Sequence, residues 1–146
     1  MAGDPPLTHS PLHLLHRVHQ CAGELFQSQM ADVDLTTTQY TVLVATAEKD
    51  GLSQQEIINF TGIDRSTVSQ VVQLLIRKGF LKRRRTRMDA RTYAVSLTEY
   101  GCDVLKASEQ IVSRVEEALV QALPASRAKT FIANLRAIVG AFEVAK

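Results

Sequence analysis

The chain has 146 residues, of which 45% are apolar, 22% charged and 5% aromatic. This length suits one globular domain or a compact two-part unit, and the composition is that of a folded protein rather than a disordered one. No stretch reaches the ~20 apolar residues that span a bilayer, and residues 1–11 lack the basic and apolar regions of a secretory signal. Two cysteines, Cys21 and Cys102, are too few for a disulfide scaffold. The sequence therefore predicts a reduced, cytoplasmic protein that has no membrane partner.

The net charge of +2 conceals a strong local asymmetry. Residues 77–91 contain eight Lys or Arg and a single acid, so this segment carries +7 and the rest of the chain −5. Such a concentration favours a polyanionic partner that is contacted by one small part of the surface. A solvated basic loop is the alternative interpretation.

The N-terminal part of the chain predicts two helices. Ser10 followed by Pro is typical of a helix start, and apolar residues then recur at three- and four-residue spacing over about 11–29. Thr36-x-x-Gln39 is a capping box that predicts the start of the second helix. Gly51 is expected to end this helix, because glycine adopts the left-handed conformation found just past a helix.

Two short helices are predicted next. Ser53-x-x-Glu56 is a second capping box and begins a helix that runs to about Phe60. Asp64 then caps a helix with apolar residues at helical spacing, which Gly79 ends. Two short helices joined by a glycine-containing turn are typical of a helix-turn-helix unit.

A β-hairpin is expected directly after this unit. Residues 80–85 and 91–97 flank a short charged segment, and apolar and polar residues alternate in the second of them as in a half-buried strand. A helix-turn-helix followed by a basic hairpin is a winged helix. We therefore predict a winged helix-turn-helix module for DNA binding over about residues 36–97.

Thr98 caps a long helix that is predicted over about 99–123 and is broken by Pro124, and a last helix is expected from Ser126. The outer helices are too elongated to fold round the module alone, and their apolar stripes need a partner. The expected fold is mostly α with a small β-hairpin wing, a single chain over 1–146 with dimerisation helices at 11–29 and 98–145. A two-fold homodimer is the commonest solution, and a monomer with the outer helices folded back is the alternative.

Candidate DNA contacts follow from the module. The second helix of such a unit enters the major groove, where Arg pairs with guanine and Gln with adenine. The N-terminus of the first helix favours a phosphate, and the hairpin arginines suit the DNA backbone. The candidate residues are Ser53, Gln54, Gln55, Arg65, Ser66, Thr67, Ser69, Gln70, Arg83, Arg84, Arg85 and Arg87.

The sequence over about residues 11–145 resembles the MarR family of bacterial transcriptional regulators. The most specific part is the wing motif DAR at 89–91, followed by LTxxG at 97–101. The resemblance implies a two-fold dimer that binds a pseudo-palindromic operator in double-stranded DNA. It also implies that Arg91 enters the minor groove and that Asp89 orients it. Members of this family are usually repressors released by a small ligand, a metal or an oxidant.

The resemblance also implies a ligand site where the dimerisation helices meet the winged helix. In this chain the region holds five polar side chains that could meet an aromatic acid, a phenol or a thioester as the small-molecule effector. They are His13, His16, Arg17, Gln20 and Tyr40. We expect His16, Arg17 and Tyr40 to orient the anionic or phenolic group of this effector, in a crevice between the first, second and long helices.

Metal and redox sensing are the alternative sensor chemistries. His13, His16 and His19 step by three along a helix and drift round its axis, so that at most two could share a metal, and no metal site is predicted. In peroxide-sensing relatives the reactive cysteine falls at the position of Leu12. Cys21 lies nine residues further on and departs from that pattern.

Two other classes of protein fit the sequence less well than a DNA-binding regulator. The sequence has no glycine-rich phosphate loop, no carboxylate pair in an apolar context and no nucleophile elbow, so neither an enzyme nor a cofactor is predicted. A winged helix used only for protein contact would have no need of the positive charge on the wing.

Overall fold

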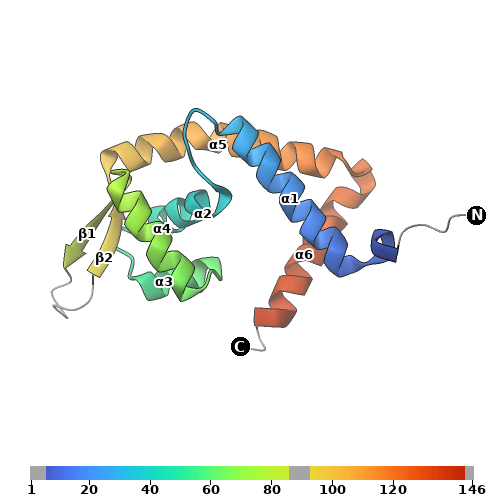
Figure 1. Ribbon diagram of the computed structural model, residues 1–146, viewed down its shortest axis with the longest axis horizontal. Helices are drawn as coiled ribbons and strands as arrows, with labels where there is room; N and C mark the ends of the chain where they lie inside the picture. Colours follow the sequence, from blue (N-terminus) through green and yellow to red (C-terminus); the bar gives the residue numbers. More distant parts are fainter. Residues whose placement is uncertain (1–5, 86–92, 144–146) are drawn as a thin grey trace, which may run out of the picture.

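The structure is a computed structural model that describes residues 6–85 and 93–143. The winged-helix elements gather at one end of the molecule, α1 and α6 lie at the other, and α5 runs between the two ends (Figure 1). The elements in chain order are η1 (Pro6–His9), α1 (Pro11–Gln29), α2 (Thr37–Ala47), α3 (Gln54–Thr61), α4 (Arg65–Arg77), β1 (Leu81–Arg85), β2 (Tyr93–Leu97), α5 (Glu99–Gln121), η2 (Ala125–Arg127) and α6 (Ala128–Glu143).

Five helices begin at the caps that the sequence predicts. Ser10, Thr36, Ser53, Asp64 and Thr98 each accept a hydrogen bond from the backbone N–H three residues further on. A cap of this kind stabilises a helix by about 0.5–2 kcal/mol. The predicted helix starts at these five positions are therefore confirmed, and each has a local cause.

Two predicted boundaries are wrong. The second helix was expected to reach the turn at Gly51, but α2 ends at Ala47. Gly51 lies in the following turn with φ +82°, because the chain there leaves the helix to bring Leu52 beside β2. The last helix was expected from Ser126, but this residue lies in the 3₁₀ turn η2 and α6 starts two residues later.

The hairpin is tied to the helices by a bridge that the sequence did not predict. β1 and β2 are antiparallel, with Leu81 opposite Leu97. Leu52, from the α2–α3 turn, exchanges two backbone hydrogen bonds with Val95, at 2.9 and 2.7 Å. The middle of β2 is thus held against the α2–α3 turn of the helix-turn-helix unit.

The apolar core lies in the winged helix and in the parts of α1 and α5 that cover it. Among the described residues, α6 contributes no buried side chain, and Phe26 is the only buried side chain of α1. Instead, Leu12 is 81% exposed on α1 and Phe142 is 71% exposed on α6. No helix in the described part of the chain is long and apolar enough to cross a membrane.

Candidate nucleic-acid interface and ligand site

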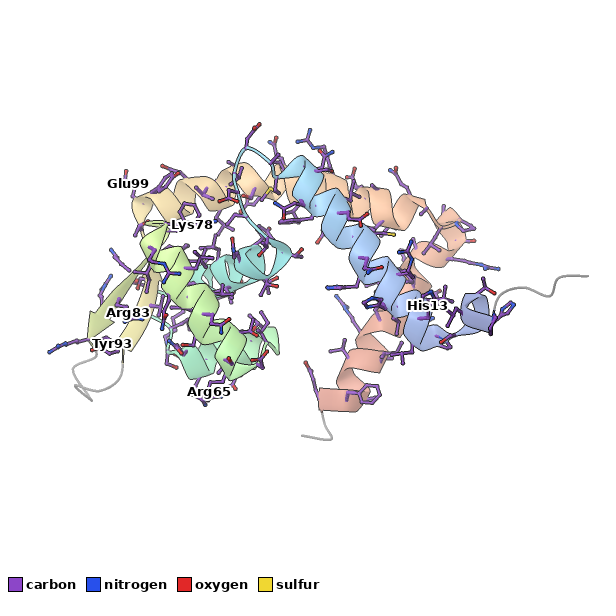
Figure 2. All side chains as sticks on the ribbon, in the orientation of Figure 1. His13, Arg65, Lys78, Arg83, Tyr93 and Glu99 are labelled. Atoms are coloured by element: carbon purple, nitrogen blue, oxygen red, sulfur yellow. The ribbon has the colours of Figure 1, made fainter. Side chains whose placement is uncertain are left out.

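The N-terminal end of α4 presents polar side chains to solvent. Val68 and Val72 are fully buried on one face of this helix, whereas Arg65 and Gln70 are exposed on the other. Figure 2 shows Arg65 at the outer edge of the module, at the start of α4. Of the other predicted residues of α4, Ser66 is exposed, and Thr67 and Ser69 are half-buried.

A hydrogen bond between α4 and α3 holds the predicted base-reading arginine. The guanidinium of Arg65 donates to Oε1 of Gln55, and the amide of Gln55 donates to Oδ1 of Asn59 at 3.0 Å. The structure thus brings together two predicted residues from different helices. Asn59 was missed, because an exposed polar residue in a short helix carries no signal by itself.

Two predicted DNA contacts also take part in helix capping, Ser53 as the cap of α3 and Thr67 as the donor to Asp64, the cap of α4. The hydroxyl of Thr67 donates to Asp64 at 2.7 Å, and this bond and the Thr67 backbone N–H hold the pKa of the Asp64 carboxyl below its usual value. Ser53 caps α3, and its backbone N–H donates to Glu56 at 2.8 Å. Gln54 is half-buried next to this cap. Glu56 keeps a negative charge close to the proposed phosphate position at the start of α3.

The three predicted arginines of β1 are exposed, but two of them already have intramolecular partners. Nη2 of Arg84 lies 3.1 Å from Oδ2 of Asp50, and the guanidinium of Arg83 lies 5.5 Å from the centre of the Tyr93 ring. Arg85 is at the exposed end of the strand. The predicted contacts Arg87, Asp89 and Arg91 lie outside the described residues.

The predicted ligand-binding residues fall into two groups. His13 is half-buried and His16 exposed near the start of α1, and Nη1 of Arg17 donates to Oε1 of Gln20 at 3.0 Å. Tyr40 belongs to α2 and is half-buried.

Tyr40 packs on Phe26, with ring centroids 5.9 Å apart. Phe26 is nine residues from Arg17, about 13 Å along the helix axis, so a single chain does not bring Tyr40 and Arg17 together. Burial raises the pKa of the Tyr40 hydroxyl, with smaller contributions from Glu109 and Glu116. This phenol is therefore a neutral hydrogen-bonding group.

A cavity of about 400 Å³ lies between α1, the end of α5 and α6. It is almost wholly apolar, and Arg17 is the one residue of its lining that carries a charge. The ligand crevice expected from the sequence, between α1, α2 and α5, stays a prediction, and this cavity lies beside a different set of helices that includes α6. The lining residues are Leu14, Arg17, Val18, Cys21, Leu119, Ala122, Leu123, Phe131 and Leu135.

A helix-turn-helix unit with a basic wing, carried on long helices with exposed apolar faces, defines a winged-helix transcriptional regulator. Residues 33–92 match the model of the MarR family. The chain belongs to the MarR family, whose members are transcriptional regulators, and the family and fold expected from the sequence are confirmed.

Three relatives show how far the similarity extends. The chain is 29% identical to the transcriptional repressor NicR of Pseudomonas putida over 131 residues. This alignment covers 90% of this chain and 83% of NicR. The crystal structure of the regulator PcaV from Streptomyces coelicolor, in complex with its natural ligand, matches with a TM-score of 0.87 and 30% identity over 97% of this chain and 99% of PcaV. The repressor CouR, bound to a 23-mer DNA duplex, matches with a TM-score of 0.86 and 26% identity over 95% of this chain and 99% of CouR.

Proposed function

We propose that the chain is a homodimeric repressor that binds a pseudo-palindromic operator through two winged helices and releases it when a small aromatic acid binds. It acts in the cytoplasm and catalyses no reaction. The observation that carries the proposal is the exposed polar end of α4 beside a basic wing, on a module joined by α5 to helices with exposed apolar faces. NicR and CouR, both named as repressors, support the sign of control.

Because the core lies in the winged helix, we assign DNA binding and dimerisation to different parts of the chain. The module over residues 36–97 reads DNA, and the helices over 11–29 and 98–145 form the dimer. The centres of two half-sites lie about 34–36 Å apart on DNA. A helix of 23 residues such as α5 is about 34 Å long, so a small tilt of α5 moves the module by an appreciable part of that spacing.

In the DNA complex, Arg65 pairs with guanine and Gln70 with adenine in the major groove. Arg83, Arg84, Arg85 and Arg87 bind phosphates, together with the start of α3. Arg91, oriented by Asp89, enters the minor groove, where the negative potential is enhanced.

Removing Arg84 is expected to weaken binding to every duplex. Arg84→Ala should reduce the slope of log affinity against log salt by about one, as expected for the loss of one phosphate contact. Asp50→Asn should strengthen binding to every duplex, because it frees Arg84 from its ion pair.

By contrast, Arg91→Ala should weaken binding to the operator alone, by about 1–3 kcal/mol of binding free energy. Fluorescence anisotropy at several salt concentrations measures these effects, with a duplex selected from a random pool and an unselected duplex.

Two outcomes would contradict these assignments. If Arg84→Ala left the salt slope unchanged, Arg84 would not contact the DNA backbone. If the wild-type chain failed to bind random duplex even at low salt, the chain would be a protein-interaction module and the whole proposal would fall.

Effector response is expected to depend on Arg17. A carboxylate paired with this guanidinium leaves its aromatic ring facing the apolar cavity, and charge-assisted pairs of this kind are strong and directional. We expect 4-hydroxybenzoate to release DNA from the wild type. Arg17→Ala should need at least about tenfold more of it, the factor for a loss of ~1.4 kcal/mol. Titration of the DNA complex by anisotropy measures both.

Gln20→Ala is the matched control, because it removes the neighbour of Arg17 but keeps the charge. Equal release of the Arg17→Ala and wild-type complexes would remove Arg17 from the site. Release by peroxide or Zn²⁺ alone would instead favour a redox- or metal-responsive regulator of the same family.

A further inference from the structure

Lys78, at the C-terminal end of α4, turns away from the wing and makes three contacts with the α1–α2 region. Its Nζ donates to the backbone carbonyl of Asp34 at 2.6 Å, to Oδ2 of Asp34 at 3.1 Å and to Oε1 of Gln39 at 3.4 Å. Only 22% of the Lys78 side chain is exposed. Figure 2 shows Lys78 at the end of α4 opposite to Arg65. Lys78 is therefore part of the basic segment 77–91 in the sequence, but its charge is already paired within the chain.

Two of the three acceptors of Lys78, the backbone carbonyl of Asp34 and the side chain of Gln39, are held in place from the other side, whereas the Asp34 side chain is 86% exposed. Asp34 has a left-handed backbone with φ +51°, which a residue other than glycine rarely adopts, and its N–H donates to the carbonyl of Met30 at 3.1 Å. Gln39 is buried, and its side chain also accepts from the N–H of Thr36 in the capping box of α2. The contact therefore joins α4 to a turn of fixed shape.

This contact connects two parts that the proposed function requires to be aligned. The α1–α2 turn is the point at which the chain passes from the proposed dimerisation helix into the module. α4 is the helix whose other end is proposed to read bases. Residues 34 and 78 are far apart in sequence, so the contact adds a long-range link between α4 and the α1–α2 turn to the packing of the helix in the core.

We propose that Lys78 is a positioning residue that locks the DNA-reading helix to the α1–α2 turn, and that it thereby sets the half-site spacing that the dimer accepts. The inference rests on the proposed function, because spacing has a meaning only for a dimer on two half-sites. With Lys78 in place, the two reading helices lie at one separation, and an operator with altered spacing must distort the protein or the DNA. Without it, α4 is held by its core packing alone, a tilt of the helix costs less, and operators with altered spacing become acceptable.

Two substitutions with opposite effects on charge test the joint, by which we mean the contact of Lys78 with Asp34 and Gln39. Lys78→Met removes all three contacts and one positive charge. Asp34→Gly removes the carboxylate and one negative charge, and glycine accepts the left-handed backbone without strain. Charge alone predicts that the first variant binds DNA more weakly and the second more tightly. The joint predicts instead that both lose spacing preference. Lys82→Met is the matched control, since Lys82 is an exposed lysine of β1.

The measurement is affinity for duplexes that carry the half-sites selected by the wild type, with the spacer unchanged or altered by one or two base pairs. The spacing ratio is the affinity for the unchanged spacer divided by the affinity for an altered one. Lys78→Met should reduce this ratio at least about tenfold, the scale of one hydrogen bond to a charged group. Asp34→Gly should reduce it less, because the backbone carbonyl remains. Lys82→Met should weaken all duplexes equally and keep the ratio, and Lys78→Arg should restore most of it.

An unchanged ratio in both Lys78→Met and Asp34→Gly would overturn the inference, as would opposite changes in the two. Thermal unfolding identifies any variant that fails to fold, and Asp34→Gly then tests the joint without a change in α4. If the wild type itself showed no spacing preference or bound as a monomer, the proposed function would fail rather than the role of Lys78 alone.

Discussion

Ending the chain after Leu123 is expected to convert the protein from a dimer to a monomer and to abolish specific operator binding. The deletion removes α6, whose apolar side chains are exposed in the single chain, with Ile138 46% and Val139 54% exposed. A patch of this kind marks an interaction surface, and a second copy of the chain is the partner in the proposed dimer. Two linked half-site contacts exceed one by about 10²–10⁴ in affinity, so we expect at least about a 100-fold loss.

The winged helix itself should survive this deletion. None of the buried core residues that the structure describes belongs to α6, so the shortened chain should keep a cooperative thermal transition. Light scattering measures the mass, and anisotropy measures binding to operator and to random duplex. Ile138→Asp is the matched control: it keeps α6 but introduces a charge into its apolar face, and it should also give a monomer. A full-length chain that is monomeric at micromolar concentration would contradict the proposed assembly.

The parts of the fold that were predictable are those with local causes. Ser53 and Glu56 exchange two hydrogen bonds although they are only three residues apart, so the capping box can be recognised from four consecutive residues. The hairpin was predictable because the apolar–polar alternation and the charged turn adjoin each other in the sequence. Its alternation was only partly followed: Tyr93 is exposed and Ser96 is buried, and the Ser96 hydroxyl lies beside Gly51 in the α2–α3 turn.

The contacts that position the site were beyond sequence reasoning because they join distant residues. The bond between Arg65 and Gln55 links two helices, and Arg84 meets Asp50 across 34 residues. Each of these side chains is, in the sequence, one polar residue among many, and only the packing of the core selects its partner. The apolar cavity has the same origin, since its walls come from α1, the end of α5 and α6.

Replacing Gly101 by alanine is expected to destabilise the junction between the wing and α5. A Cβ at this position would lie 2.1 Å from the carbonyl oxygen of Phe80 and 3.2 Å from the side chain of Leu97. The carbonyl cannot move freely, because it accepts the N–H of Thr98 at 3.0 Å. The Thr98 hydroxyl in turn donates to the carbonyl of Gly79 at 2.6 Å and accepts the N–H of Gly101 at 2.9 Å. This close approach is the physical reason for the LTxxG motif.

Because the obstacle is backbone, relief of the clash must move α5 away from the start of β1. Overpacking of this kind costs about 1–3 kcal/mol, sometimes more, and here it also turns the wing relative to α5, so operator affinity should fall with stability. Gly23→Ala is the matched control: nothing lies within 4 Å of a Cβ there, and alanine should add up to about 1 kcal/mol of helix stability. Thermal and urea unfolding measure both variants. If Gly101→Ala unfolded at the same urea concentration as Gly23→Ala, the contact with Phe80 would not constrain the junction, and α5 would be free to tilt against the wing.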